Sequence, residues 1–261
     1  MISSRHNESI KTIRRLRGRQ GDHALLEGPH LLEEALASGL ELETVLATPE
    51  ALRRPEVVHL MSLLDRPPLE VDAALLDTLA DADSPRGLLA LARLPRSGAE
   101  SLPAAGDAVL LYLDGVQDPG NVGALARVAE AFGARALALA PGCAHPNHPR
   151  ALRASAGSLL RLPVAVGATI AGVDARCGPG TRWAALAAHG GRLIDDLEWR
   201  SGPWVLAVGA EGSGLSNELE ARLDERWTIR LDRRVESLNV AVAGGIALFS
   251  LAAARRRAAR A

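Results

Sequence analysis

The sequence predicts an α/β protein built from two domains, and two observations carry that prediction. Short apolar runs alternate with stretches of helical periodicity along most of the 261 residues, as strands and helices do in α/β folds. Residues 96–107 interrupt this alternation with a Pro-, Gly-, Ser- and Ala-rich segment that has no periodicity, which is typical of a linker. We therefore expect a first domain over residues 1–95 and a second over residues 108–261.

The first domain has the pattern of a small α/β module. Ile10, Ile13 and Leu16 recur at helical spacing, which predicts a helix within the first twenty residues. Further strands are expected at residues 25–26, 43–46, 57–58 and 88–94, and further helices at residues 30–38 and 69–79.

The second domain opens with the apolar strand 109–113, followed by a loop and a helix that Gly133 ends. Later strands are expected at residues 136–140, 163–166, 183–187, 204–208 and 227–231, and helices at 150–161, 216–223 and 239–257. Because strands and helices alternate throughout, we expect a mostly parallel sheet covered on both faces.

The charge composition bears on the class of partner. The formal net charge is −1, which argues weakly against a nucleic-acid ligand. Lys11 is the only lysine, however, and the remaining basic residues are arginines, which bind phosphate bidentately. Drift in an Arg- and Ala-rich genome would produce the same bias, so both interpretations stay open.

Other features indicate a cytoplasmic protein without a membrane segment. No apolar run approaches the length of a membrane span, and the beginning MISSRHNESIK lacks the apolar core of a signal peptide. Cys143 and Cys177 lie far apart and outside any CxxC pair, so no disulfide framework is indicated. The stretch CAHPNHP lacks a fourth ligand, which favours a surface loop over a metal site.

The predicted N-terminal helix has a strongly basic face. Its positive residues lie close together and include Arg5, Lys11, Arg14, Arg15 and Arg17. We expect this face to contact nucleic-acid phosphates, and the alternative is an ordinary solvated helix face.

Three joints between strands and helices collect the polar residues of the second domain. Asn121 and Arg127 follow the first strand, Glu211 lies in the turn 209–214, and a third cluster contains Glu236, Ser237 and Asn239. Each joint also has a plain structural interpretation, because Asn and Ser cap helices and helical Arg is usually solvated.

The familiar nucleotide-binding loops are absent from the sequence. The first strand of the second domain leads into DGVQDPGN rather than GxGxxG, and no GxxxxGK[ST] sequence occurs. A nucleoside-like cofactor would therefore have to be held by another arrangement.

Three ordered segments resemble one known family. NVGALARVAEAFG, LAVGAEGSGLSNEL and SLNVAVAGGIAL are similar to the three motifs of the SpoU, or TrmH-like, branch of the SPOUT RNA 2′-O-ribose methyltransferases. The N-terminal stretch SRHNESIKTIRRLRGRQGDHALLEGPHLLEEAL resembles the L30e-like (L7Ae-like) substrate-binding domain that is often fused to this branch.

The resemblance implies an α/β-knot (SPOUT trefoil knot) in the second domain, which periodicity alone could not predict. It also implies a homodimer and S-adenosylmethionine bound near the subunit interface. The residues that it assigns to the cofactor are Gly209, Ile229, Leu238, Leu231 and Ala207.

The same resemblance implies a set of catalytic residues. Arg127 would be essential, either as the base or as a cation that holds the alkoxide or phosphate, and both roles stay open because guanidinium normally remains protonated. Asn121 would orient Arg127 or the ribose, and Glu211 would hold its loop and position Arg127. Ser237 and Asn239 would contact the target phosphate or shape the cofactor loop.

The sequence departs from the family at Ile229-Arg230-Leu231, where Ile-Pro-Met is usual, and at Val128, where Thr is usual. The favoured function is methylation of ribosomal RNA, and the alternatives are methylation of tRNA or RNA binding without catalysis. A generic small-molecule enzyme is disfavoured, because the basic N-terminal module would then have no use.

Overall fold

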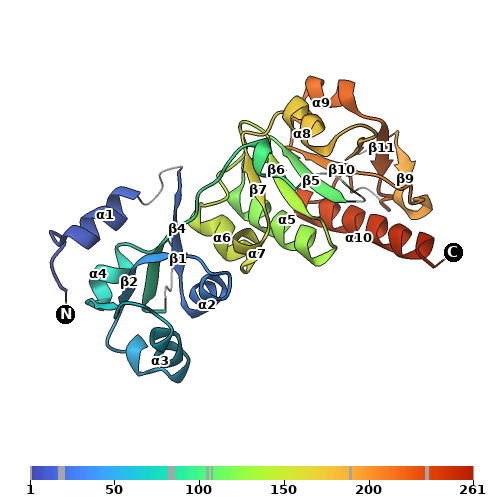
Figure 1. Cartoon of the computed structure of the whole chain (residues 1–261). Coiled ribbons are helices and arrows are strands. Elements are labelled where there is room, and N and C mark those ends of the chain that lie inside the picture. Colours follow the sequence, from blue (N-terminus) through green and yellow to red (C-terminus); the bar gives the residue numbers. More distant parts are fainter. Residues whose placement is uncertain are drawn as a thin grey trace. The chain divides into compact units, whose positions relative to one another are not determined.

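The computed structural model describes residues 2–16, 21–81, 86–103, 106, 108–187, 190–232 and 235–260. The chain forms two compact units, whose elements are labelled in Figure 1. The first unit comprises Met1–Pro95 and His145–Arg161, and the second comprises Arg96–Ala144 and Leu162–Ala261. None of the described helices combines the length and the apolar character that crossing a membrane requires.

The first unit is built on a four-stranded sheet in the order β1-β4-β2-β3. β1 (His23–Glu27) and β2 (Leu42–Ala47) run antiparallel to the central β4 (Leu88–Arg93), and β3 (Leu69–Glu70) runs parallel to β2. β4 lies between β1 and β2 and is buried from Leu88 to Ala92.

Helices cover this sheet through the apolar positions that the sequence indicates. Ile10 and Ile13 of α1 (Glu8–Leu16) pack in one cluster with Leu75 of α4 (Ala73–Asp77) and Leu89 of β4. α2 (Pro29–Ala37) contacts both β1 and α3 (Pro55–Ser62). The amphipathic N-terminal helix is thus confirmed, with its apolar side against the sheet.

The segment 145–161 belongs to the first unit although it lies far along the sequence. It contains α6 (Pro149–Ser155) and α7 (Ser158–Arg161). Arg153 donates to Glu27 at 2.8 Å and to Asp81 at 2.9 Å, and the side chain of Glu27 is only 2% exposed. Asn147 donates to the carbonyls of Gly21 (3.0 Å) and Leu94 (2.8 Å). Polar side chains therefore attach this segment to the small sheet.

Two expectations for segments that lie in the first unit are wrong, and the second of them had been made for the second domain. The strand expected at residues 57–58 lies inside α3, which begins at Pro55 and buries Val57 and Leu60 at helical spacing. The single helix expected over residues 150–161 is divided into α6 and α7 by left-handed backbone at Ala156 (φ 46°) and Gly157 (φ 92°).

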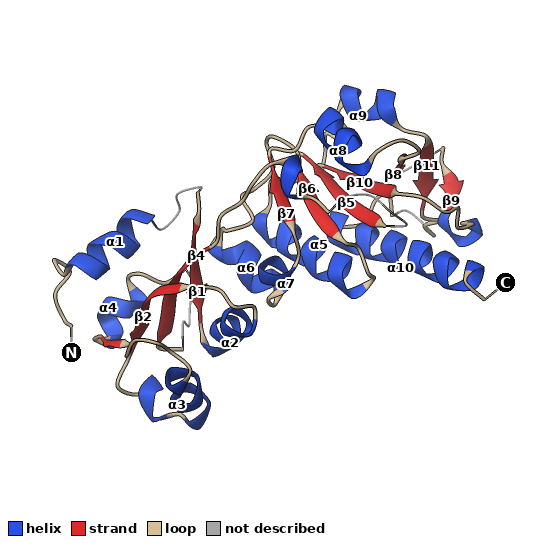
Figure 2. Ribbon diagram, in the orientation of Figure 1, coloured by secondary structure: helices blue, strands red, loops and turns tan. Residues whose placement is uncertain are grey.

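The second unit is built on a seven-stranded sheet in the order β7-β6-β5-β10-β8-β11-β9, shown as red arrows in Figure 2. All of its pairings between described strands are parallel, which confirms the predicted sheet. The strands are β5 (Val109–Asp114), β6 (Ala136–Leu139), β7 (Val164–Val166), β8 (Arg182–Leu186), β9 (Arg192–Leu193), β10 (Trp204–Gly209) and β11 (Glu225–Thr228).

Different helices cover the two faces of this sheet (Figure 1). α5 (Pro119–Ala131) and α10 (Val240–Ala258) pack together on one face, where a Cβ at Gly244 would lie 2.6 Å from Leu125. α8 (Ile170–Cys177) and α9 (Asn217–Arg222) cover the other face. On that second face burial raises the pKa of Tyr112, so its hydroxyl stays protonated and donates to the carbonyl of Ala168 at 3.1 Å.

Candidate active site

The centre of the second unit is where β5 and β10 end side by side. Asp114 and Gly209, the last residues of these strands, are paired in register. β6 and β7 lie beyond β5, whereas β8, β11 and β9 lie beyond β10, so the strand order changes direction here. Such a switch point at the carboxyl ends of parallel strands is the usual place for a ligand in an open α/β sheet.

A tight turn follows β10 and brings main chain back toward the end of the strand. Ala210 and Gly214 exchange two backbone hydrogen bonds of 3.0 Å, and Gly212 (φ 97°) and Gly214 (φ 72°) are left-handed. A Cβ added at Gly209 would lie 2.5 Å from the carbonyl carbon and oxygen of Gly214. Only glycine at position 209 therefore permits this approach.

Three polar side chains from the three predicted joints form one hydrogen-bonded cluster, which we call the amide–carboxylate cluster. Glu211 Oε1 accepts from Asn121 Nδ2 at 2.8 Å and from Asn239 Nδ2 at 3.1 Å. Asn239 Nδ2 also donates to Asn121 Oδ1 at 3.0 Å. Segments that are far apart in sequence thus converge on a single carboxylate oxygen.

The local structure explains how Asn121 is free to join this cluster. Asp118, not Asn121, caps α5, because its Oδ1 accepts from the backbone nitrogens of Gly120 (2.6 Å) and Asn121 (3.1 Å). The capping interpretation of Asn121 is therefore wrong. Asn239 has both roles, since its Oδ1 caps α10 while its Nδ2 donates to the cluster.

Asp114 is a residue of the site that the sequence interpretation missed. It is 8% exposed, and its Oδ2 accepts from the backbone nitrogen of Ser216 at 2.6 Å. The bond holds the exit of the turn against the end of β5. A carboxylate placed directly after a buried strand was the signal that could have identified it.

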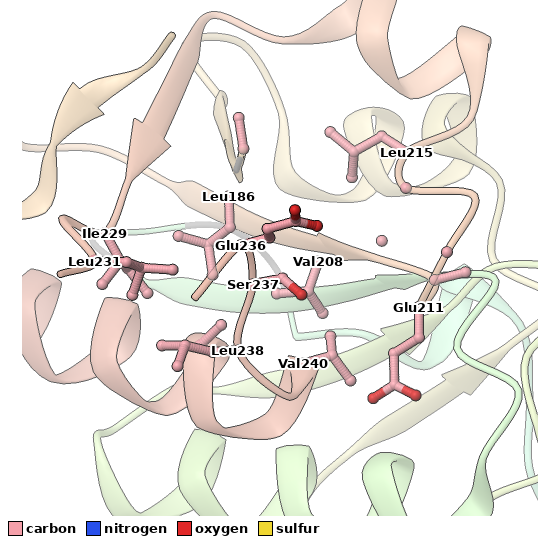
Figure 3. A pocket seen from close by; sticks show the side chains of 16 residues that line it. Leu186, Val208, Glu211, Leu215, Ile229, Leu231, Glu236, Ser237, Leu238 and Val240 are labelled. Carbon is pink, nitrogen blue, oxygen red and sulfur yellow. The ribbon is translucent and has the colours of Figure 1, made fainter. Parts of the chain in front are cut away.

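A cavity of about 250 Å³ opens between the turn and the loop before α10 (Figure 3). Gly209, Ile229, Leu231 and Leu238, which are four of the five residues expected to hold the cofactor, line it. Ala207 does not line it, which corrects the expectation for its side chain. Because side chains alternate along a strand, Ala207 points to the opposite face of the sheet, where it is fully buried.

The expected catalytic residues are only partly brought together. Glu211 and Ser237 line the cavity, and Asn121 and Asn239 meet Glu211 at its edge. Arg127 is exposed on α5 and has no hydrogen bond or ion pair with any residue that the structure describes. The expected contact between Glu211 and Arg127 is therefore absent within the described part of one chain, where the two amides serve Glu211 instead.

An apolar groove lies beside the cluster on the outer side of α5 and α10. Its apolar walls include Val128 of α5, Phe132 directly after α5, and Val242, Ile246 and Phe249 of α10. The rings of Phe132 and Phe249 meet edge to face with centroids 5.6 Å apart, and 52% of Phe249 is exposed. Asn121 and Asn239 also line this groove, so it is continuous with the cluster.

In the first unit, Arg5, Lys11, Arg14 and Arg15 are exposed, as the predicted basic face requires. Lys11 lies 2.7 Å from Glu8, and this hydrogen bond holds the pKa of the Glu8 carboxyl below its usual value. Arg17, the fifth residue expected to bind RNA, lies outside the described residues.

The stretch considered as a metal site has structural bonds. Burial raises the pKa of the Cys143 thiol, and its sulfur donates to the carbonyl of Leu113 at 3.2 Å. His148 Nδ1 accepts from the backbone nitrogen of Arg150 and so caps α6.

Comparisons with known proteins agree with this geometry. The profile of the SpoU rRNA Methylase family matches residues 108–249, and the MRM3-like substrate binding domain matches residues 7–90. The 23S rRNA (guanosine(2553)-2′-O)-methyltransferase RlmP of Bacillus subtilis is 30% identical over 254 residues, which cover 96% of this chain and 98% of that protein.

Solved structures give the same result. The AdoMet-bound rRNA methyltransferase of Sinorhizobium meliloti matches with a TM-score of 0.81 and 27% identity, over 98% of this chain and 97% of that one. The SpoU methyltransferase AviRb of Streptomyces viridochromogenes shares the fold, with a TM-score of 0.84 at 24% identity over 97% and 100% of the two chains.

The fold and the site thus define a methyltransferase of the α/β-knot class that uses S-adenosylmethionine. The chain belongs to the SpoU rRNA methylase family. The resemblance of the three motifs to that family is thereby confirmed.

The cavity fits this cofactor on its own geometry. Ile229, Leu231 and Leu238 supply apolar walls for a purine. Gly209 lets the backbone of the turn close on the end of the strand, where a Cβ has no room. Backbone and apolar surface, rather than a glycine-rich phosphate loop, would therefore hold the nucleoside.

Proposed function

We propose that this chain transfers a methyl group from S-adenosylmethionine to a ribose 2′-oxygen of ribosomal RNA. The observation that carries the proposal is the amide–carboxylate cluster of Asn121, Glu211 and Asn239 at the edge of the cofactor cavity. The name of the Bacillus subtilis relative describes the same reaction on 23S rRNA.

The cofactor supplies an electrophilic methyl group on a sulfonium. The residues of this chain must place the ribose oxygen in line with that methyl and assist the loss of one proton. Glu211 is held in one position by two amides, so it can fix the turn beside the methyl donor. Asn121 would then orient the ribose, and Ser237 and Asn239 would contact the target phosphate or shape the loop.

Arg127 is proposed as an essential catalytic residue that acts as a cation. Guanidinium stays protonated in proteins, so a role in holding the developing alkoxide or the adjacent phosphate suits it better than a role as base. Arg127→Ala should abolish methylation while cofactor binding stays measurable by calorimetry. Arg135→Ala, which changes another exposed arginine of the same unit, is the matched control, and turnover by Arg127→Ala would remove the residue from the mechanism.

We also propose that the chain is a homodimer whose second copy covers the groove between α5 and α10. Val242 and Phe249 are each 52% exposed there, although they are large and apolar. Arg127 precedes Val128 of the groove by one residue and therefore lies about 100° around α5 from it. A second subunit bound at the groove would bring Arg127 close to the ribose in that subunit's active site. Within its own chain, Arg127 does not reach the cavity.

This arrangement has a sharp test. Arg127→Ala and Gly209→Ala are mixed, unfolded and refolded together, and assayed at a cofactor concentration at which each variant alone has almost no activity. If Arg127 serves the cavity of the other subunit, random dimers regain about a quarter of the wild-type activity, because each heterodimer has one intact site. No recovery in a mixture that contains heterodimers would show that Arg127 acts within its own chain.

Ribosomal RNA is favoured over tRNA because the first unit matches a substrate-binding domain and presents a basic α1. We also propose a location in the cytoplasm, which is consistent with such a substrate. Mapping 2′-O-methyl groups in ribosomal and transfer RNA, with and without the gene, tests the proposal directly. One ribosomal site should disappear; loss of a tRNA site instead would establish the alternative, and no change would favour an inactive RNA-binding protein.

A further inference from the structure

A second carboxylate of the cofactor cavity has no part in the cluster described above. Glu236 lines the cavity together with Glu211. Figure 3 shows its carboxylate among the lining side chains, between Leu186 and Leu215, whereas the carboxylate of Glu211 points away from them. Of these two residues, Glu236 is therefore the one whose carboxylate points into the cavity.

Glu236 differs from Glu211 in the partners that the described residues supply. Asn121 and Asn239 donate to Glu211, but Glu236 has no hydrogen bond or ion pair with any of the described residues. The described lining includes no Lys, Arg or His. A carboxylate at the wall of the cavity attracts any cation that enters beside it, and none of the described lining residues supplies a countercharge.

The two forms of the cofactor differ by one positive charge. Methyl transfer moves the methyl to the ribose oxygen, releases the hydroxyl proton and leaves a neutral thioether where the sulfonium was. The purine, the ribose and the amino-acid part are unchanged. Apolar walls cannot distinguish the two forms by charge, whereas a fixed carboxylate can.

We propose that Glu236 is the specificity-determining residue that makes the cavity prefer the sulfonium form of the cofactor over its demethylated product. The inference rests on the proposed methyl-transfer function. The preference lowers inhibition by the product, because loss of the charge weakens binding as soon as the methyl has been transferred. Glu236 thus couples the chemistry to release of the spent cofactor.

The test compares three ligands by calorimetry on the full-length chain: S-adenosylmethionine, sinefungin and S-adenosylhomocysteine. Sinefungin has an amine in place of the methyl sulfonium and keeps the cation, whereas S-adenosylhomocysteine lacks it. In Glu236→Gln, which keeps the side-chain shape, the Kd of both cationic ligands should rise about 5-fold and that of S-adenosylhomocysteine less than about 2-fold. Glu218→Gln, which neutralises an exposed carboxylate of α9, should change none of the three.

An equal rise for all three ligands would mean that Glu236 acts through packing or through the amino-acid part, and the proposal would be overturned. An unchanged Kd for the cationic ligands would overturn it as well. A second measurement needs only the wild-type chain: its preference for S-adenosylmethionine over S-adenosylhomocysteine should fall as salt rises, because ions screen the carboxylate. If the wild-type chain binds none of the ligands, the cofactor site itself fails, which is a different result from a site without charge preference.

Discussion

The two units of this chain use polar side chains for different purposes. In the first unit, Arg153 and Asn147 join the segment 145–161 to the small sheet through three buried or half-buried bonds and one exposed bond, from Arg153 to Asp81. In the second unit, Asn121, Glu211 and Asn239 gather at the ends of parallel strands, beside a cavity. The bonds of the first unit attach one segment to the sheet, whereas those of the second unit orient polar side chains toward a ligand site.

This difference predicts which substitutions should lower stability and which should lower activity. Bonds that attach elements contribute mainly to the free energy of unfolding. Bonds that orient groups at a cavity contribute mainly to catalysis, because the scaffold is already formed by the parallel sheet. Changes in the two units should therefore give different kinds of defect.

The largest loss of cofactor affinity is expected at Gly209 of the second unit. In Gly209→Ala the new Cβ would lie 2.5 Å from the Gly214 carbonyl, so the turn must move out of the cavity. We expect S-adenosylmethionine affinity to fall by about 100-fold, for a distortion of about 3 kcal/mol. Calorimetry measures it, with Gly106→Ala as control because nothing lies within 4 Å of a Cβ there. Wild-type affinity in Gly209→Ala would show that the turn does not shape the site.

Asn239 allows the structural and chemical roles of one side chain to be separated. Asn239→Ala removes the α10 cap as well as the cluster bonds, so the free energy of unfolding should fall by about 1–2 kcal/mol. Asn239→Asp keeps an oxygen to cap the helix but places a second carboxylate beside Glu211. It should retain stability and lose about 10- to 100-fold in methylation rate.

Thermal unfolding and single-turnover methylation measure the two effects of Asn239. Asn217→Asp, at the first residue of α9, is the matched control and should change neither. If Asn239→Asp methylates at the wild-type rate, Asn239 acts only as a helix cap and its bonds within the cluster have no part in catalysis.

The sequence predicted the second unit better than the first, for a physical reason. Parallel strands buried on both faces leave long apolar runs, and the motifs at their ends brought Asn121, Glu211 and Asn239 into consideration together. In the first unit, the same Val-Val pair at 57–58 that suited a strand is part of α3, because Pro55 and the burial of Leu60 set helical spacing. Short apolar runs do not distinguish helical periodicity from strand periodicity.

Other features depended on contacts that sequence patterns do not contain. The attachment of residues 145–161 to the first unit rests on Arg153 reaching Glu27, which lies 126 positions away. The bond from Ser216 to Asp114 spans 102 positions. Arg127 was expected beside Glu211, and the two amides of the cluster lie there instead. Tertiary neighbours decided each of these cases.

A smaller effect is expected at Arg153, and it should appear in stability rather than in cofactor affinity. Arg153→Ala removes the guanidinium from Glu27, whose side chain is only 2% exposed, and from Asp81. The free energy of unfolding should fall by about 2 kcal/mol. Urea denaturation measures it, with Arg53→Ala as the exposed control.

The pair can be tested further by a double-mutant cycle. Adding Glu27→Gln to Arg153→Ala should recover part of the loss, because the uncompensated buried charge is removed. Strictly additive losses, or a defect in cofactor binding with unchanged stability, would contradict the distinction between the units.

The smallest effect is expected on the exposed face of α1, where Arg14 and Arg15 are the two described arginines of the helix. If they bind phosphate, Arg14→Ala/Arg15→Ala should weaken ribosomal RNA binding about 5-fold at moderate salt, and the slope of log K against log [salt] should become shallower by about 1 to 2. Arg53→Ala/Arg66→Ala, which removes two other exposed charges of the first unit, is the matched control. Equal RNA affinity and equal slopes in the two double variants would make the α1 face a solvated surface and leave RNA recognition to the rest of the chain, whereas a difference confined to α1 would give the first unit a ligand-binding role beside its structural one.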